Sequence, residues 1–362
     1  MEARAARNRL APPYGENDPA GLSVDALRLA RAVEELLRAA GAMGSSDSNT
    51  NGGSEADADD AEGRTRRRKW ALSRDFKVRW SSPLVGKASC KARTLHAERI
   101  LALACAAGCC VQEAARVLCG GAGVEGVAAV EAARAASAAL RRAAGIWEAV
   151  SRAGHEAVAS DANLCGERSA EAYAGVAEAM SAVALADAQA AVALAAEHRA
   201  TPSRALAAKL HRGAAQLYDG ASDALRAASR GLEAAPSALL YYLRLAPSLT
   251  MARARRCLAV DVRAADRTGE AVSLLRRAKA SLDATAAEPP PLGVAAAGGG
   301  AWAEALAAER AAVAAELGRA ESENGLMMQP TPNKPLAIEA KVIVTAIPYG
   351  EDLERVALAD DE

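Results

Sequence analysis

Long segments with the apolar spacing of amphipathic helices follow one another through most of this chain. Residues 203–234 are an example, because their apolar side chains recur at helical spacing at Leu206, Leu210, Ala214, Leu217, Ala221 and Leu225. Alanine, which has the highest helix propensity, dominates, whereas aromatic residues make up only 3%. We therefore expect an all-α protein with helices over about 24–40, 92–118, 128–153, 168–199, 203–234, 247–266, 268–285 and 301–322.

The size of the side chains limits how these helices can pack. Alanine buries little apolar surface, so each helix pair gains less from burial and has to approach closely. A chain of 362 residues is also long for one compact domain. An elongated array fits both facts, because each helix in it buries its apolar face against its neighbours.

Two short segments look like strands rather than helices. Residues 76–80 (FKVRW) alternate apolar and charged side chains, and residues 341–347 (KVIVTAI) favour a strand or an extended segment before Pro348. Residues 289–300 read as a loop.

The N-terminal part differs in composition from the rest of the chain. Residues 44–63 are polar, rich in glycine and acidic, which is typical of a disordered linker. We expect an N-terminal helix and a linker (44–69) within residues 1–69, a helical domain over 70–350 and an acidic tail over 351–362.

Charge and cysteine content point to a cytoplasmic protein that is not a general polyanion binder. The chain has 44 basic and 45 acidic residues and a net charge of -1, which leaves room only for a local basic face. The seven cysteines are odd in number and lack the spacing of a disulfide framework, so we expect reduced thiols. We predict no secretory signal and no membrane-spanning segment, because the most apolar stretch, 179–196, contains Asp187.

A basic run follows the acidic linker directly, at Arg64, Arg66, Arg67, Arg68 and Lys69. Three interpretations stay open: a solvated charged segment, weak contact with an acidic membrane surface, and a nuclear-import-like peptide.

The sequence contains fragments of catalytic motifs, but each lacks a residue or a structural context that the motif requires. The letters of a dinucleotide fingerprint occur at Gly121, Gly123 and Gly126, but an alanine-rich helix precedes them where a strand is required. His155-Glu156 lacks the second histidine of a zinc protease motif. We therefore expect no catalytic residue, cofactor, metal, nucleic acid or small-molecule substrate.

Several segments in order resemble the Bro-one domain, the helical domain of ALIX-type endosomal-sorting proteins. Most of the resemblance lies in FKVRW (76–80), AAGIWEAV (143–150), LADAQAAVAL (185–194), ALAAKL (205–210), AAQLYDGA (214–221), GEAVSLLRRA (269–278), SENGLMMQPTP (322–332) and KVIVTAIPY (341–349). Together these segments cover about residues 70–350 and look like the stand-alone plant and algal type.

The resemblance implies a bent helical solenoid with a middle similar to tetratricopeptide repeats and a small β element. It implies a non-enzymatic adaptor, cytoplasmic and recruited to endosomes, that acts in multivesicular-body sorting or membrane remodelling. Its concave apolar groove would hold the C-terminal amphipathic helix of an ESCRT-III subunit. Carried over, the groove positions fall on Val192, Leu206 and Leu210, with Lys209 beside them.

Two alternatives to this groove stay open. Leu206 and Leu210 belong to a leucine stripe, and such a stripe is more often part of a core than of a binding surface. The chain could also keep the fold as a protein-interaction scaffold without binding ESCRT-III. The exposure of Val192, Leu206 and Leu210 discriminates between these readings.

Overall fold

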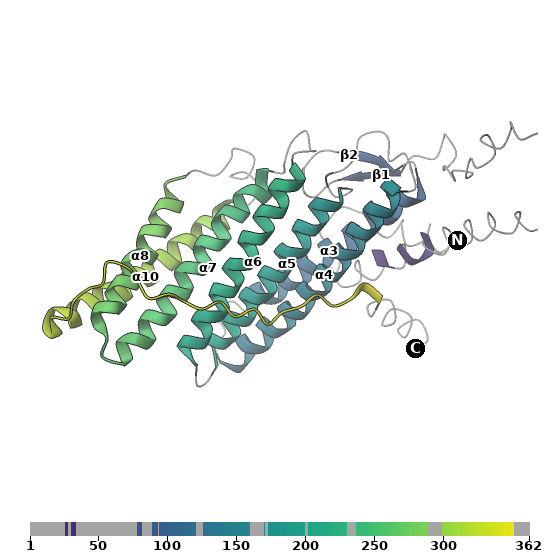
Figure 1. Ribbon diagram of the computed structural model, residues 1–362. Coiled ribbons are helices and arrows are strands. Elements are labelled where there is room, and N and C mark those ends of the chain that lie inside the picture. The colour runs from purple at the N-terminus through teal and green to yellow at the C-terminus, as the bar shows by residue number, and fades with distance from the viewer. Residues whose placement is uncertain are drawn as a thin grey trace, which may run out of the picture.

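A row of long antiparallel helices makes up the body of the protein (Figure 1). The computed structural model describes residues 26–27, 30–33, 78–81, 89–92, 94–120, 126–159, 170, 173–199, 202–229, 237–288 and 299–350. The long helices within this part of the chain are α3 (Leu95–Gly120), α4 (Val127–Ala159), α5 (Ala174–Glu197), α6 (Arg204–Ser229), α7 (Ser237–Ala264), α8 (Thr268–Ala286) and α10 (Gly299–Met327). Each packs mainly on the next along the chain, so the expectation of a helical array is confirmed.

A small β-hairpin precedes the helices. β1 (Val78–Ser81) pairs antiparallel with β2 (Ser89–Ala92), with Val78 opposite Ala92 and Ser81 opposite Ser89. The strand expected at FKVRW is therefore present, whereas its partner was not foreseen. Thr94 then accepts the backbone N–H of Ala97 at 3.1 Å and caps α3.

Helix ends differ most from prediction around Pro247. We expected a helix to begin at this proline, but α7 begins at Ser237 and runs through it. Proline inside a helix removes one backbone hydrogen bond. Burial of Leu239, Leu243 and Leu245 on the preceding turns offsets that cost. The other helices predicted from residue 92 onward agree with the structure to within about five residues at each end, except that α5 starts about six residues later and α4 ends about six residues later.

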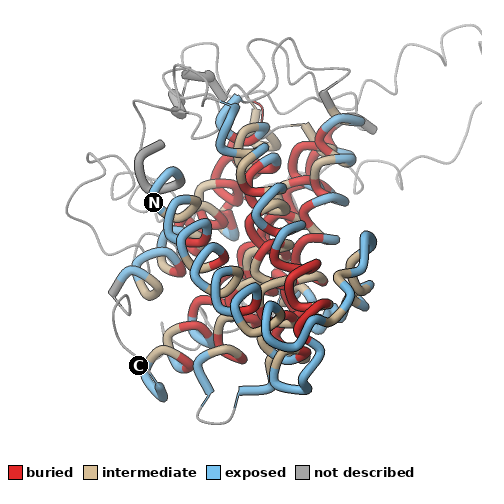
Figure 2. Tube along the Cα trace, turned by 90° about the vertical axis from the view of Figure 1, so that its left-hand side faces the viewer, coloured by how far each residue is buried: buried red, intermediate tan, exposed pale blue. Residues whose placement is uncertain are grey.

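The core is built largely from alanine, as Figure 2 shows by the buried stripe along the inside of the helices. On α5 alone, most buried positions are alanines, which allows both flanking helices to approach closely. The larger anchors of the core include Ile146 and Trp147 on α4 and Leu274 and Leu275 on α8.

Two helices are long and apolar enough to cross a membrane by length and composition, Leu95–Cys119 and α5. In both, more than half of the most apolar window is buried in the protein (56% and 61%). Core helices of a soluble array pass the same test, so this is weak evidence for a membrane span.

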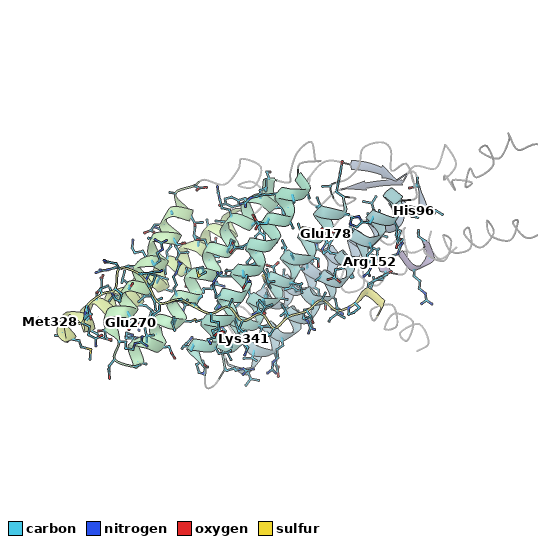
Figure 3. All side chains as sticks on the ribbon, viewed as in Figure 1. His96, Arg152, Glu178, Glu270, Met328 and Lys341 are labelled. Carbon is cyan, nitrogen blue, oxygen red and sulfur yellow. The ribbon has the colours of Figure 1, made fainter. Side chains whose placement is uncertain are left out.

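An extended segment, residues 328–348, returns along one side of the array after α10 ends (Figure 1). We call it the strap. It starts at the far end of the molecule, where Met328 lies, and passes Lys341 on its way back toward α4 (Figure 3). Residues 341–347 are extended, as expected, but they form no strand with any described residue; they bond to helices instead.

Candidate partner-binding surface

Gln189, which is fully buried on α5, ties the strap to two helices. Its Nε2 donates to Leu210 O on α6 at 3.2 Å and to Lys341 O on the strap at 2.8 Å. Its Oε1 accepts the backbone N–H of Ile343 at 3.1 Å. One side chain therefore satisfies two strap groups that would otherwise lose their hydrogen bonds to water.

The strap meets α6 and α4 through the same arrangement. Lys341 N donates to Lys209 O at 3.0 Å, and the Lys341 carbonyl lies against Gly213, which follows Lys209 by four residues on α6. Ile347 N donates to Arg141 O at 3.0 Å, and the Ile347 carbonyl lies against Gly145, which follows Arg141 by four residues on α4. A Cβ on either glycine would overlap the strap carbonyl, so the close approach requires glycine.

The predicted groove residues lie where the strap crosses α5 and α6. Leu210 is only 2% exposed and belongs to a core cluster with Ala207, Ala208 and Cys257. The Leu210 side chain therefore belongs to the core of the protein.

The other predicted residues lie at the edge of that cluster. Val192 and Leu206 are half-buried and pack against it, as does Ile338 of the strap. Lys209 Nζ lies 2.7 Å from Glu339 of the strap, and 43% of the Lys209 side chain is exposed. The structure thus brings Val192, Leu206 and Lys209 together beside the strap. The basic run Arg64, Arg66, Arg67, Arg68 and Lys69 lies outside the described residues.

A buried carboxylate that the sequence did not reveal joins three helices. Asp187 Oδ1 on α5 accepts the hydroxyl of Tyr218 on α6 at 2.5 Å and that of Tyr242 on α7. The two tyrosine rings meet edge to face with centroids 5.8 Å apart. Burial raises the pKa of Asp187 to about 6, although both tyrosine hydrogen bonds act to lower it. The buried Tyr218 hydroxyl therefore has Asp187 as a hydrogen-bond partner.

A second polar cluster lies at the α5 end that faces α6 and α7. Glu197 Oε1 lies 2.5 Å from Nε2 of the fully buried His211, and Arg256 reaches Glu197 Oε2 at 3.5 Å. Burial would raise the pKa of Glu197, but the hydrogen bond from His211 and the charges of His211, Arg256 and Arg253 lower it to about 2.

Glu197, His211 and Cys257 place their ligand atoms within 4.8 Å of one another, a spacing that a metal ion could use. Burial raises the pKa of the Cys257 thiol to about 12, and the carboxylate is already paired with Arg256 and Arg204. A divalent cation would have to displace a tightly held proton next to two guanidinium groups. We therefore interpret this cluster as an ion-pair network of the core.

Comparison with known proteins identifies the family. The BRO1-like domain family matches residues 69–360. The chain belongs to the BRO1-like domain family. Its helical array is the fold of solved Bro1 domains, which confirms the resemblance seen in the sequence.

Three solved structures illustrate the similarity. A structure described as the basis for endosomal targeting by the Bro1 domain has a TM-score of 0.64 at 15% identity, over 98% of this chain and 83% of that one. A complex of the ALIX BRO1 domain with CHMP4C has the same TM-score and identity, over 96% and 84%. ALIX in complex with the SIVmac239 PYKEVTEDL late domain has a TM-score of 0.64 at 16% identity, over 96% of this chain and 43% of that one. No curated protein matches the sequence significantly.

Proposed function

We propose that this BRO1-like domain is a non-enzymatic endosomal-sorting adaptor that binds the C-terminal amphipathic helix of an ESCRT-III subunit. The observation that carries the proposal is membership of the family over residues 69–360, together with the solved complex of a similar domain with CHMP4C. Cytoplasmic localisation with recruitment to endosomes is part of the same proposal, as is a role in multivesicular-body sorting or membrane remodelling.

The proposed contact surface is formed by Val192, Leu206 and Lys209, next to the strap. Two half-buried aliphatic side chains offer an apolar strip, and Lys209 offers a cation that already pairs with an exposed carboxylate, Glu339. A helix with apolar anchors and an acidic residue at its edge would fit such a surface. Val192 is smaller than the bulky aromatic residue that the family usually has at this position. The loss of two or three methylene equivalents costs on the order of 2 kcal/mol, which lowers the expected affinity by more than about tenfold.

The test is binding of the full chain to peptides from the C-terminal helices of the ESCRT-III subunits of its own organism. Leu206→Asp should abolish binding because it places a charge in the apolar strip. Leu326→Asp is the matched control, since Leu326 is 87% exposed at the end of α10, away from this surface. Circular dichroism should show that each variant folds.

Lys209→Glu extends the test without touching the core, because the Lys209 side chain lies in an exposed ion pair. We expect weaker binding of an acidic-edged helix, while folding is retained. If the folded wild type binds none of the peptides, the adaptor proposal fails and the fold assignment is unaffected.

A scaffold that keeps the fold but not ESCRT-III binding is the second candidate. The burial of Leu210 favours it, because one of the expected anchors is not available at the surface. Recovery of a different partner by the wild type, together with failure of all ESCRT-III peptides, would support the scaffold.

The basic run from Arg64 to Lys69 carries a separate, weaker proposal of contact with acidic membranes. Loss of vesicle binding when these five residues are neutralised would support it.

A further inference from the structure

Most described arginines of α6 to α10 have a carboxylate partner, and the exceptions gather in one place. Ion pairs hold Arg204, Arg226, Arg244, Arg253, Arg256, Arg263, Arg267, Arg276, Arg310 and Arg319. No described carboxylate forms an ion pair with Arg212 on α6, Arg255 on α7 or Arg277 on α8. We call these three side chains the cationic notch.

Helix register places the three arginines at one level of the array. Cys257 on α7 has its sulfur within 4.8 Å of a His211 ring nitrogen on α6, so Arg255 and Arg212 stand at the same height on adjacent helices. Ser248 on α7 bonds to Thr285 of α8 at 2.7 Å and meets Ser281 at 3.1 Å. Arg255 lies two turns after Ser248 on α7. Arg277 lies one to two turns before Ser281 and Thr285 on α8, which runs antiparallel to α7, so the two arginines lie at about the same level.

The strap marks one border of the notch. Ser273 on α8 donates to Pro332 O of the strap at 2.7 Å, and Arg277 lies one helical turn beyond Ser273. Lys209 contacts the strap on α6, and Arg212 lies one turn beyond Lys209. Because α6 and α8 run parallel, both arginines lie on the same side of the strap.

Neighbouring arginines show that the lack of partners is not general. Arg256, next to Arg255, pairs with the buried Glu309 of α10 at 2.7 Å. Arg276, next to Arg277, pairs with Glu321 of α10 at 2.8 Å. In each couple one cation is neutralised by α10 and the other is left in the notch.

The cost of this arrangement falls on Arg255. It is half-buried, and its burial and the charges of Arg277 and Arg212 lower its pKa. Burial raises the pKa of Asp219 and the charge of Arg212 acts to lower it, but neither Asp219 nor Asp223 forms an ion pair with Arg212. Three cations from three helices at one level, one of them partly desolvated, suit a multiply charged anion.

We propose that Arg212, Arg255 and Arg277 bind a phosphate group. Guanidinium groups match phosphate oxygens in paired hydrogen bonds, and a phosphomonoester with close to two negative charges balances three cations better than one carboxylate does. The phosphate could belong to a soluble polyphosphate or to a phospholipid headgroup. This inference is independent of the ESCRT-III proposal, since it uses none of the same side chains.

The first experiment titrates the full chain with tripolyphosphate by calorimetry and by thermal unfolding. We expect saturable binding that weakens with added salt and a rise in the unfolding temperature. Arg277→Gln should reduce affinity by about tenfold or more, because it removes one charge-assisted pair. Arg276→Gln is the matched control: it removes the same charge one residue away, and the affinity should change by less than about twofold.

Arg255→Gln separates binding from folding. Without ligand this variant should be at least as stable as the wild type, because removal of Arg255 relieves repulsion in the notch. With tripolyphosphate it should show no rise in unfolding temperature. Equal losses in the Arg276→Gln and Arg277→Gln variants, or no saturable binding by the wild type, would overturn the proposal.

Vesicles distinguish the two sources of phosphate. Phosphatidylcholine vesicles containing phosphatidic acid should sediment with the wild type and not with Arg277→Gln if the headgroup of a lipid is the ligand. Binding of tripolyphosphate without vesicle binding assigns the site to a soluble phosphate. If an acidic peptide such as polyglutamate binds equally well and with the same dependence on Arg277, the site recognises negative charge in general and the phosphate assignment is wrong.

Discussion

At the scale of single residues, buried polar side chains join the helices of this alanine-rich core. Asp187 connects α5 to tyrosines on α6 and α7, and Gln189 connects α5 to α6 and the strap. Alanine contributes little apolar area, so these few hydrogen bonds also specify which helices lie against each other. Substitution of either side chain should therefore change the stability of the protein in a way that depends on the chemistry of the group removed.

Asp187→Asn should change how stability depends on pH. The unfolded pKa is near 3.8 and burial raises the folded pKa to about 6, so the carboxyl contribution is full below about 3.8 and is lost as pH rises through about 6. Asparagine keeps an acceptor for Tyr218 and Tyr242 without this loss. We expect the variant to gain on the wild type by up to about 3 kcal/mol between pH 4 and 7. Urea unfolding across this range measures the difference, and parallel stability profiles of the two proteins would contradict it.

Gln189→Leu should destabilise the protein by about 3 kcal/mol, because two carbonyl groups and one N–H each lose a hydrogen bond. Gln216→Leu is the control on the exposed side of α6 and should change the unfolding free energy by no more than about 0.5 kcal/mol. Chemical denaturation measures both. Equal stability of the two variants would show that Gln189 does not anchor the strap.

At the scale of elements, the strap is seated by repeated geometry. On the strap, Ile347, which contacts α4, comes six residues after Lys341, which contacts α6. An extended chain of that length spans about 20 Å, which is two helix-to-helix spacings. The strap thus advances by one complete repeat while it passes over α5. The two glycine contacts fix this register.

Gly213→Ala and Gly220→Ala provide a matched test within α6. At Gly213 the new Cβ would overlap Lys341 O, so we expect a loss of about 2 kcal/mol or more and easier cleavage of the strap by protease. At Gly220 nothing lies within 4 Å of the new Cβ, so alanine should stabilise the helix by up to about 1 kcal/mol. A stabilising Gly213→Ala change would mean that the strap does not rest on α6 in solution.

Much of this element-scale structure is readable from the sequence. The spacing of apolar residues predicted the helices, because the buried face of an amphipathic helix repeats with the same period as the helical backbone. The start of α7 was missed because tertiary burial outweighed the local effect of Pro247. The strap contacts were also missed, since Gly213 and Gly145 look like weak helix positions until the segment that crosses them is known. The burial of Leu210 and the gathering of Arg212, Arg255 and Arg277 depend on neighbours far apart in the chain.

At the scale of the whole molecule, helices contact mainly their neighbours in the chain, apart from α7 with α10, whereas the strap contacts α8, α6, α5 and α4. Arrays held only by neighbour contacts lose cooperativity easily. The strap adds long-range contacts that should make the array unfold as one unit.

A chain that ends at Met327 should therefore unfold at lower temperature and in more than one step. Calorimetry of this truncation beside the full chain measures both the midpoint and the ratio of calorimetric to van't Hoff enthalpy. A single transition at the wild-type midpoint would show that the strap contributes nothing to cooperativity.

The direction of the strap also has a mechanical consequence. It ends on α4, so a pull on the C-terminal side would load Ile347 first, then the Gln189 contacts, and then Lys341. These attachments would break one after another, so the force needed to detach the strap would be the force that breaks a single attachment. A pull between α3 and α10 would instead stretch the strap along its length and load its attachments together. The strap therefore resists a pull on its C-terminal side weakly and resists stretching of the helical array strongly.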